Sequence, residues 1–369
     1  MVLLGRWSNR DCCNFTKDLM KNEKNLLTIA IPAYNRVETL EKLIIQLKFQ
    51  SDQNFNLLIL DDASPDNHAI ELMVSKYKKQ MPNLVFNRNT ENLGFSGNIC
   101  KLYELATTRY IWFMCDDDTV FSDAVRNIND SLKKYQPVVA IYNHTWVTPY
   151  GVKLVAGPDR NIVYENLLNF KDYQPFMRTT FLSSLVLERR LDISKVKETN
   201  YTDNVFVQMT ISLLLLSDKF RLCEIAIPVL HRNVGYNYGD FYKFYLVDIL
   251  KAVYAIDHNL DNNLVVKFMK GEIFNGLKLY LSQKLGLFNY TMVPTKETVN
   301  LISKYYGNFK YFIFSFKYIY MFTPSLLLKG IYLVQLVFIH GIIRGLKVYN
   351  KNINRAYTDL RKTGFTNYK

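Results

Sequence analysis

The chain has 369 residues, of which 49% are hydrophobic and 21% are charged, with a net charge of +13. This balance excludes an intrinsically disordered protein and fits two or three packed units of ordinary domain size. Five cysteines without paired spacing argue against a zinc module or a disulfide scaffold. Residues 1–24 are polar and interrupted by charges, so we expect an extension there and no secretory leader.

Short apolar runs alternate with helical patterns from residue 26 onward. Strands are expected at 26–31, 57–60, 84–86 and 110–114, each closed by residues that do not continue a strand. Apolar residues at helical spacing predict helices beginning near Glu38, around 70–77 and at 99–105. This alternation indicates an α/β fold, in which a mostly parallel sheet is covered by helices on both faces.

The pattern loosens in the second half of the chain. Further strands are expected at 138–142, 179–187 and 220–227, and Asp203 is expected to open an apolar helix at 204–216. Helices dominate from residue 238 onward, including one at 264–285. The sequence thus predicts an N-terminal extension (1–24), an α/β domain (25–237) and a helical C-terminal region (238–369).

Positive charge is concentrated at the C-terminal end. Residues 301–369 hold eleven Lys or Arg and a single acid, among many Tyr, Phe, Ile and Leu. Such a block fits an anionic membrane surface or nucleic acid. Nucleic-acid binding would place the aromatic residues in a polar background, so a membrane surface is favoured and no nucleic-acid partner is expected. The alternative is an ordinary helical domain whose aromatic residues form its core.

The block does not identify a transmembrane helix, and the sequence leaves open whether the region inserts into the membrane or lies on it. Its longest apolar stretch, residues 330–343, would span roughly 21 Å as a helix, short of the ~30 Å hydrocarbon core. We therefore expect a cytoplasmic protein that is peripheral on the cytoplasmic face of the membrane.

Polar residues of the first half gather where the predicted strands end. The four segments are 32–36, 61–66, 88–97 and 115–119. Parallel strands finish at one edge of a sheet, where such folds bind ligands. We therefore expect these loops to converge, although they are scattered in the sequence.

Three consecutive acids, Asp116, Asp117 and Asp118, directly follow the predicted strand 110–114. Two such charges at ~4 Å repel each other by about 4 kcal/mol at an effective dielectric constant of about 20. A bound Mg²⁺ or Mn²⁺ would relieve the repulsion, because hard cations prefer carboxylate ligands. The alternative is a solvated acidic turn that caps the helix expected after Ser122.

Two weaker signals lie in the other loops. Asp61 and Asp62 end the second strand, where a carboxylate can accept hydrogen bonds from a ribose hydroxyl or a base N–H; an Asx turn before Pro65 is the alternative. Gly94 and Gly97 precede a helix and allow close approach of a phosphate. Their spacing is neither a dinucleotide fingerprint nor a P-loop, so an ordinary loop is the alternative.

A resemblance to glycosyltransferase family 2 is carried by four segments in order and spacing: TIAIPAYNR (28–36), LLILDDAS (57–64), NTENLGFSGN (89–98) and YIWFMCDDDT (110–119). The later FLSSLVLERR (181–190) and VLHRNVGYN (229–237) resemble the abequosyltransferase-like branch, which builds O-antigen and capsule. The resemblance implies the Rossmann-like GT-A fold. It also implies inverting transfer of a sugar from a nucleotide diphosphate, most often UDP, to a hydroxyl of a lipid-linked oligosaccharide in bacterial surface polysaccharide synthesis.

The resemblance also assigns roles to individual residues. Asp117 would be the leading ligand of Mn²⁺ or Mg²⁺ with Asp118 assisting, and Asp203 would be the catalytic base unless it is a simple N-cap. Cys115 stands where many members have the first acid, which leaves the division of labour among the three acids open. Nucleotide-sugar contacts would come from Pro32, Ala33, Tyr34, Asn35, Arg36, Asp61, Asp62, Asn92, Gly94 and Asp116.

Four further residues have both a functional and a structural interpretation. Ser183 and Ser184 would touch the acceptor, and His231 or Arg232 would close over the diphosphate; each can equally be structural. Two other functions also stay open: a non-catalytic sugar- or nucleic-acid-binding protein, and a nucleotidyltransferase with a similar sheet. Nucleotidyltransferases usually carry a Gly-rich, basic loop after the first strand, where this chain has PAYNR (32–36).

Overall fold

The computed structural model describes residues 25–65, 68–147, 153–166, 174–199 and 204–233, together with the single positions 248, 249, 252, 327, 330, 333 and 334. Contacts divide the chain into two compact units, Met1–Gly235 and Tyr236–Lys369. The elements below all belong to the first unit. The extension 1–24 and the helix predicted at 264–285 lie outside the described residues, and the three predicted domain boundaries stay predictions.

The first half of the described chain alternates strand and helix, as its sequence pattern predicts. Its strands run parallel in the order β3-β2-β1-β4. They are β1 (Leu27–Ala33), β2 (Asn56–Asp61), β3 (Leu84–Arg88) and β4 (Tyr110–Phe113). The connecting helices are α2 (Val37–Lys48), α3 (Ala69–Lys78) and α4 (Gly94–Leu105). The α/β prediction is thereby confirmed.

The second half adds strands to the other side of β4, mostly in the opposite direction. β9 (Leu185–Glu188) pairs antiparallel with both β4 and β6 (Val139–Val147). β10 (Leu222–Arg232) then runs parallel to β6, and β5 (Thr119–Val120) pairs antiparallel with β10. β7 (Lys153–Ala156) pairs antiparallel with the C-terminal part of β6. β8 (Ile162–Tyr164) pairs antiparallel with the N-terminal end of β10. The complete sheet is mixed.

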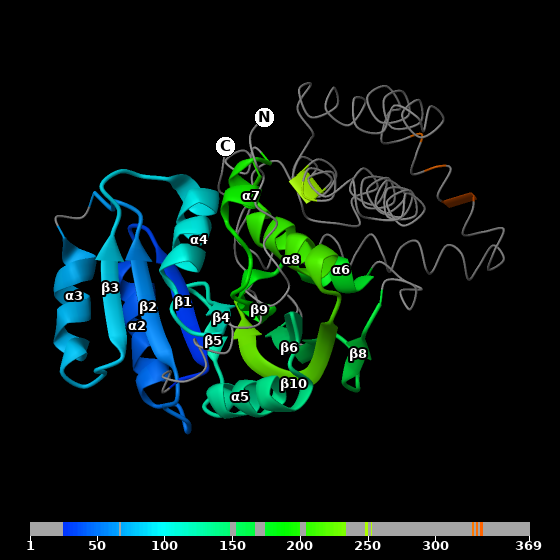
Figure 1. Ribbon diagram of the computed structural model, residues 1–369, viewed down its shortest axis with the longest axis horizontal. Helices are drawn as coiled ribbons and strands as arrows, with labels where there is room; N and C mark the ends of the chain where they lie inside the picture. The colour runs from blue at the N-terminus through cyan, green and yellow to red at the C-terminus, as the bar shows by residue number, and fades with distance from the viewer. Residues whose placement is uncertain are drawn as a thin grey trace, which may run out of the picture. The chain divides into compact units, whose positions relative to one another are not determined.

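Helices cover both faces of this sheet (Figure 1). One apolar core unites α2, α3 and α5 (Ala124–Tyr135) with alternate residues of β1, such as Leu27, Ile29 and Ile31. Successive strand residues face opposite sides of a sheet, so the residues between them face the other layer. That layer contains α4 and α8 (Val207–Asp218), which contact each other.

Three predicted elements differ clearly from the structure at their beginnings. The helix predicted at 99–105 is α4, which begins at Gly94. The strand predicted at 179–187 starts only at Leu185, because 182–184 form a short 3₁₀ helix, η2 (Leu182–Ser184). In and before η2, hydroxyls bond backward to the chain, such as Ser184 Oγ to the carbonyl of Phe181 at 2.8 Å. Such local bonds compete with a strand ladder.

The helix predicted at 204–216 runs instead from Val207 to Asp218. The side chain of Asn204 accepts a hydrogen bond from the N–H of Phe206 at 2.9 Å, and this turn delays the start of the helix. Among the described residues, no helix combines the length and the apolar character that crossing a bilayer requires.

Candidate active site

The four polar loops converge at the edge where β1 to β4 end. The N–H of Asn35 donates to Ser64 Oγ at 2.8 Å, which joins the loops after β1 and β2. Asp62 accepts from the amide of Asn89 at 2.8 Å, which joins the loops after β2 and β3. Arg36 reaches Asp116 in the loop after β4 at 3.1 Å. The sequence-based expectation of a shared edge is confirmed.

The end of β1 presents a tyrosine and a charged side chain at this edge. Pro32 and Ala33 close β1, and the Tyr34 side chain is 47% exposed. Asn35 has φ +53°, a left-handed conformation that Asn tolerates better than most residues. Arg36 directly precedes α2 and turns toward the acids that follow β4.

The two acids that end β2 already have partners in the protein. Asp61 is fully buried; its carboxylate accepts from Arg88 Nη1 at 2.5 Å and from the Ser64 hydroxyl. Asp62 Oδ1 accepts from the amide of Asn89 and from the N–H of Leu93 at 2.9 Å. Both carboxylates therefore join the end of β2 to the end of β3 and the loop after it. A direct contact of either carboxylate to a nucleotide stays a prediction.

The loop after β3 is fixed by side-chain bonds and leads into α4. Asn92 Oδ1 accepts from the N–H of Gly94 at 2.8 Å. Gly94 has φ +70°, in the left-handed region that favours glycine. Asn92 and Gly94 are both exposed at the start of α4, so they are accessible to a ligand.

The three acids after β4 do not form a solvated helix cap. They lie between β4 and β5, whereas α5 begins only at Ala124. Asp116 and Asp118 are 7% and 5% exposed. The capping alternative is therefore wrong, because Asp116 and Asp118 are buried in the sheet edge and all three acids lie several residues before the helix.

Asp116 is compensated by α2. Arg36 Nη1 lies 3.1 Å from Asp116 Oδ1 and 3.4 Å from Asp117 Oδ2. The hydroxyl of Thr39, one helical turn further on, donates to Asp116 Oδ2 at 3.3 Å. Burial raises the pKa of Asp116, and the Arg36 guanidinium is the main influence that opposes the rise.

Asp118 is less completely paired. Its Oδ1 accepts from the N–H of Asn233 at 3.2 Å, whereas its Oδ2 is buried without a hydrogen-bond partner among the described residues. Burial raises the pKa of Asp118 to about 6; the Ser183 hydroxyl opposes this rise, and the charge of Asp117 adds to it. Buried polar oxygens are nearly always satisfied by a protein group, a water molecule or an ion, so this oxygen marks a place for a further partner.

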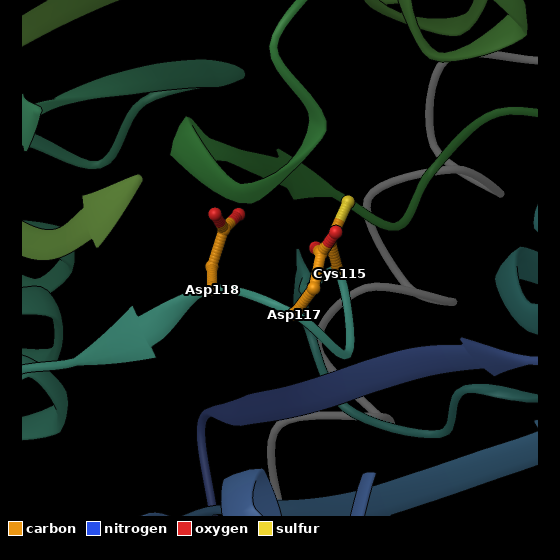
Figure 2. A group of neighbouring side chains, drawn as sticks. All are labelled: Cys115, Asp117 and Asp118. Atoms are coloured by element: carbon orange, nitrogen blue, oxygen red, sulfur yellow. The ribbon is translucent and has the colours of Figure 1, made fainter. Parts of the chain in front are cut away.

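Asp118 shares its surroundings with two further ligand-type side chains. The Sγ of Cys115 and one carboxylate oxygen each of Asp117 and Asp118 lie within 4.8 Å of one another (Figure 2). Clustered carboxylate oxygens suit a hard dication such as Mg²⁺ or Mn²⁺. The residues present therefore fit the predicted metal, and the structure offers Asp118 at least as strongly as Asp117.

The serine candidates have structural partners here. Ser183 is fully buried, and its Oγ accepts from the N–H of Cys115 at 2.9 Å. Its carbonyl accepts from the indole of Trp112 at 2.8 Å, so Ser183 links β4 to the start of the acidic loop. Ser184 is also buried and bonds to its own turn.

The basic candidates lie at the end of β10. His231 Nδ1 lies 3.0 Å from Thr145 Oγ1 on the neighbouring strand. The guanidinium of Arg232 stacks 4.9 Å from the ring centroid of Phe181. Asp203, the predicted base, lies outside the described residues.

Sequence analysis gave no role to three contributors to this edge, Thr39, Arg88 and Asn233, although Arg88 begins the polar segment 88–97. Arg88 is the last residue of β3, so its position at the carboxyl end of a strand could have indicated it. Thr39 follows Arg36 by one helical turn. Asn233 could be found only from the sheet order, which brings the end of β10 beside the loop after β4.

Comparison with known proteins agrees with this arrangement. Residues 28–181 match the family model described as Glycosyl transferase family 2. Abequosyltransferase RfbV of Salmonella typhimurium is 31% identical over 102 residues, which are 27% of this chain and 30% of that protein. Glycosyltransferase AmsB of amylovoran biosynthesis in Erwinia amylovora is 32% identical over 101 residues, 27% of this chain and 33% of that protein. The match thus spans about a third of these relatives.

Solved structures share the fold. The crystal structure of S. aureus TarS 1-349 has a TM-score of 0.54 at 14% identity, covering 90% of this chain and 91% of that one. The same protein in complex with UDP-GlcNAc has a TM-score of 0.55 at 13% identity, with the same coverage. Residues 28–181 therefore match glycosyltransferase family 2, and the described part of the chain has the GT-A fold.

Proposed function

We propose that this chain is a metal-dependent, inverting glycosyltransferase that transfers a sugar from a nucleotide diphosphate to a hydroxyl of a lipid-linked oligosaccharide in bacterial surface polysaccharide synthesis. The observation that carries the proposal is a buried oxygen of Asp118 that no described residue bonds, in a side chain beside Asp117 at the carboxyl edge of the sheet. That edge is where such sheets bind ligands. The relatives RfbV, an abequosyltransferase, and AmsB, of amylovoran biosynthesis, support the polysaccharide setting.

The three acids are proposed to have different roles, because their neighbouring side chains differ. Asp117 and Asp118 would hold Mn²⁺ or Mg²⁺, whose charge stabilises the leaving diphosphate when bound. Asp116, already oriented by Arg36 and Thr39, is proposed to contact the ribose. TarS was crystallised with UDP-GlcNAc, which supports a UDP-sugar as the donor.

The loops after β1 and β3 are proposed to border the nucleotide. Exposed Tyr34 and the accessible Asn92–Gly94 segment line the shared edge. Arg36 is 42% exposed, so its side chain has room to turn from the acids to the donor.

Asp203 is proposed as the catalytic base. It would take the proton from the acceptor hydroxyl while the new glycosidic bond forms on the face opposite the departing diphosphate, which inverts the anomeric centre. This assignment rests on the family resemblance. An Asp203→Asn variant should keep its affinity for the donor and lose transfer by about 10²-fold or more; unchanged transfer would contradict the role.

A donor panel tests the central claim. UDP-, dTDP-, GDP- and CDP-sugars are compared by thermal shift, each with and without Mn²⁺. We expect one donor class to raise the Tm only with Mn²⁺, in the unchanged protein and in Asp123→Asn, an exposed acid just before α5. Asp118→Asn should not respond. A donor shift that needs neither Mn²⁺ nor Asp118 would contradict the proposal.

The basic segment 301–369 is proposed to hold the enzyme on the cytoplasmic face of the membrane. Its charge and aromatic content support this location. Flotation with vesicles of anionic and of purely zwitterionic lipid tests it, with an Arg344→Gln/Lys347→Gln/Lys351→Gln variant. We expect binding to anionic vesicles only, weakened in the variant. Equal recovery in all four combinations would remove this part of the proposal.

A further inference from the structure

We propose that Cys115 supplies a sulfur ligand to the cation held by Asp117 and Asp118, so that the site prefers Mn²⁺ and softer dications to Mg²⁺. This inference rests on the proposed function, because it concerns the metal of the same site. It goes beyond that function by naming the residue that sets the choice of metal.

The geometry places the sulfur with the acids. Cys115 Sγ and the carboxylate oxygens of Asp117 and Asp118 lie within 4.8 Å of one another. Ligands at roughly 2.0–2.4 Å from one ion cannot lie farther apart than about 5 Å. Figure 2 shows all three side chains on the same side of the loop that follows β4.

Asp118 gives an independent reason to expect a cation at this point. Its side chain is 5% exposed, and its Oδ2 has no hydrogen-bond partner within the part of the chain that the structure describes. A carboxylate oxygen buried in this way needs a hydrogen-bond donor or a cation, and a cation also relieves the cost of burying its charge. The sulfur of Cys115 belongs to the same cluster as a carboxylate oxygen of Asp118.

The backbone of Cys115 is held in a way that orients its side chain. Its N–H donates to Ser183 Oγ at 2.9 Å, and the Ser183 carbonyl is fixed by the indole of Trp112 at 2.8 Å. Ser183 and Trp112 are both fully buried. Groups behind a metal ligand that fix its position contribute to metal affinity.

The choice of metal follows from the chemistry of sulfur. Mg²⁺ prefers an octahedral shell of oxygen atoms, whereas thiolates favour softer ions such as Zn²⁺ and Cd²⁺. Coordination breaks the Cys115 S–H bond, forms a metal–sulfur bond and releases one proton to solvent; no electron is transferred. An acid at this position would give an all-oxygen site instead.

Cobalt reports the sulfur ligand directly. The full chain is titrated with Co²⁺, and the near-ultraviolet thiolate-to-cobalt charge-transfer band is recorded. Because Cys12 and Cys13 could bind Co²⁺ elsewhere, all proteins carry Cys12→Ser/Cys13→Ser. We expect the band in this background and in the matched control Cys100→Ala, a buried cysteine of α4. We expect no band in Cys115→Ser.

Competition between metals measures the selectivity. Mn²⁺ binding is followed by electron paramagnetic resonance while Mg²⁺ is added. Cys115→Asp should retain Mn²⁺ binding, which shows that it folds, and should lower the preference for Mn²⁺ over Mg²⁺ by about tenfold. A band that persists in Cys115→Ser, or an unchanged preference in Cys115→Asp, would overturn the inference.

The outcome also separates this inference from the proposed function. Asp118-dependent Mn²⁺ binding without a cobalt–sulfur band would remove Cys115 as a ligand and leave the metal-dependent transferase intact. If no dication binds in a manner that depends on Asp118, both proposals fail.

Discussion

Buried acids follow two strands of the same sheet edge, and they differ in what surrounds them. Asp61 and Asp62, after β2, accept hydrogen bonds from Arg88, Ser64, Asn89 and Leu93. Asp118, after β4, keeps one buried oxygen that no described residue satisfies. Residue type and depth are similar in the two places. The two places differ in the number of hydrogen-bond donors that neighbouring segments supply. An acid with a full set of donors has a structural role, whereas an acid that lacks a donor can bind a ligand.

The difference has an energetic meaning. A buried carboxylate with its cationic partner is tolerated, whereas removal of that partner costs about 3–5 kcal/mol. An acid that lacks a partner in the free protein already bears part of such a cost. Substitution at the two places should therefore have opposite consequences for stability and for activity.

The largest effect is expected from Asp118→Asn. It removes the charge proposed to hold the cation, so transfer to the acceptor should fall by about 10³-fold. The free energy of unfolding without metal should change by less than about 1 kcal/mol, because no ion pair is broken and Asn can still accept from the N–H of Asn233. Initial rates and urea unfolding measure the two quantities. If Asp118→Asn loses stability but keeps full activity, Asp118 is a structural acid and the contrast with Asp61 is wrong.

Asp61→Asn should have the opposite profile. It leaves the guanidinium of Arg88, 25% exposed, without its counter-charge, so unfolding should become easier by about 2–3 kcal/mol. An accompanying Arg88→Gln change should restore part of this loss, because no charge then stays buried alone. Urea denaturation of both single variants and the double variant provides the cycle. Strictly additive losses would show that the pair is not coupled.

The first half of the fold could be predicted from the sequence because its strands are buried on both faces. β1 and β2 are continuous apolar runs that end in turn residues or acids, a pattern that needs no knowledge of neighbours. The position of β9 could not be predicted, because it inserts antiparallel between β4 and β6 from a distant segment. Local hydroxyl bonds in η2 also hid where β9 begins.

The acidic loop was predictable as a site, but the roles of its members were not. Asp116 is neutralised by Arg36, 80 residues earlier, and Asp118 is bonded to Asn233, 115 residues later. Which acid keeps an unsatisfied oxygen depends on these long-range contacts. The family resemblance placed Asp117 first among the metal ligands, whereas the burial of Asp118 makes it an equally strong candidate.

Arg36→Gln should sharpen the contrast, because it removes the guanidinium that pairs with Asp116 and Asp117. Without this competing charge, donor-free protein should bind Mn²⁺ about fivefold more tightly; the effect is modest because Arg36 is 42% exposed. Calorimetric titration with Mn²⁺ measures it. Arg126→Gln, an exposed arginine of α5, is the matched control and should leave the affinity unchanged. Weaker Mn²⁺ binding in Arg36→Gln would mean that Arg36 orients the acids instead of competing with the cation.

His144 extends the comparison to a buried group that stays neutral. It is 8% exposed on β6, its ring lies 4.4 Å from that of Phe181, and its Nδ1 has no hydrogen-bond partner among the described residues. Burial lowers its pKa to about 4, and the charges of Arg232 and Arg178 add to the shift.

The lowered pKa of His144 sets the sign of a pH effect. The unfolded chain takes up a proton near pH 6.5 and the folded chain only near pH 4, so stability from this group is complete above pH 6.5 and is lost as the pH falls toward 4. His144→Gln should flatten the fall in unfolding free energy across this window by up to about 1.4 kcal/mol per pH unit. Urea unfolding with chelator at several pH values from 4.5 to 7.5 measures the slopes. Asp118, whose raised pKa acts in the opposite direction, is present in both proteins and cancels in their difference. Parallel pH profiles would mean that His144 takes up a proton as readily in the folded chain as in the unfolded chain. Burial at this position would then not lower its pKa.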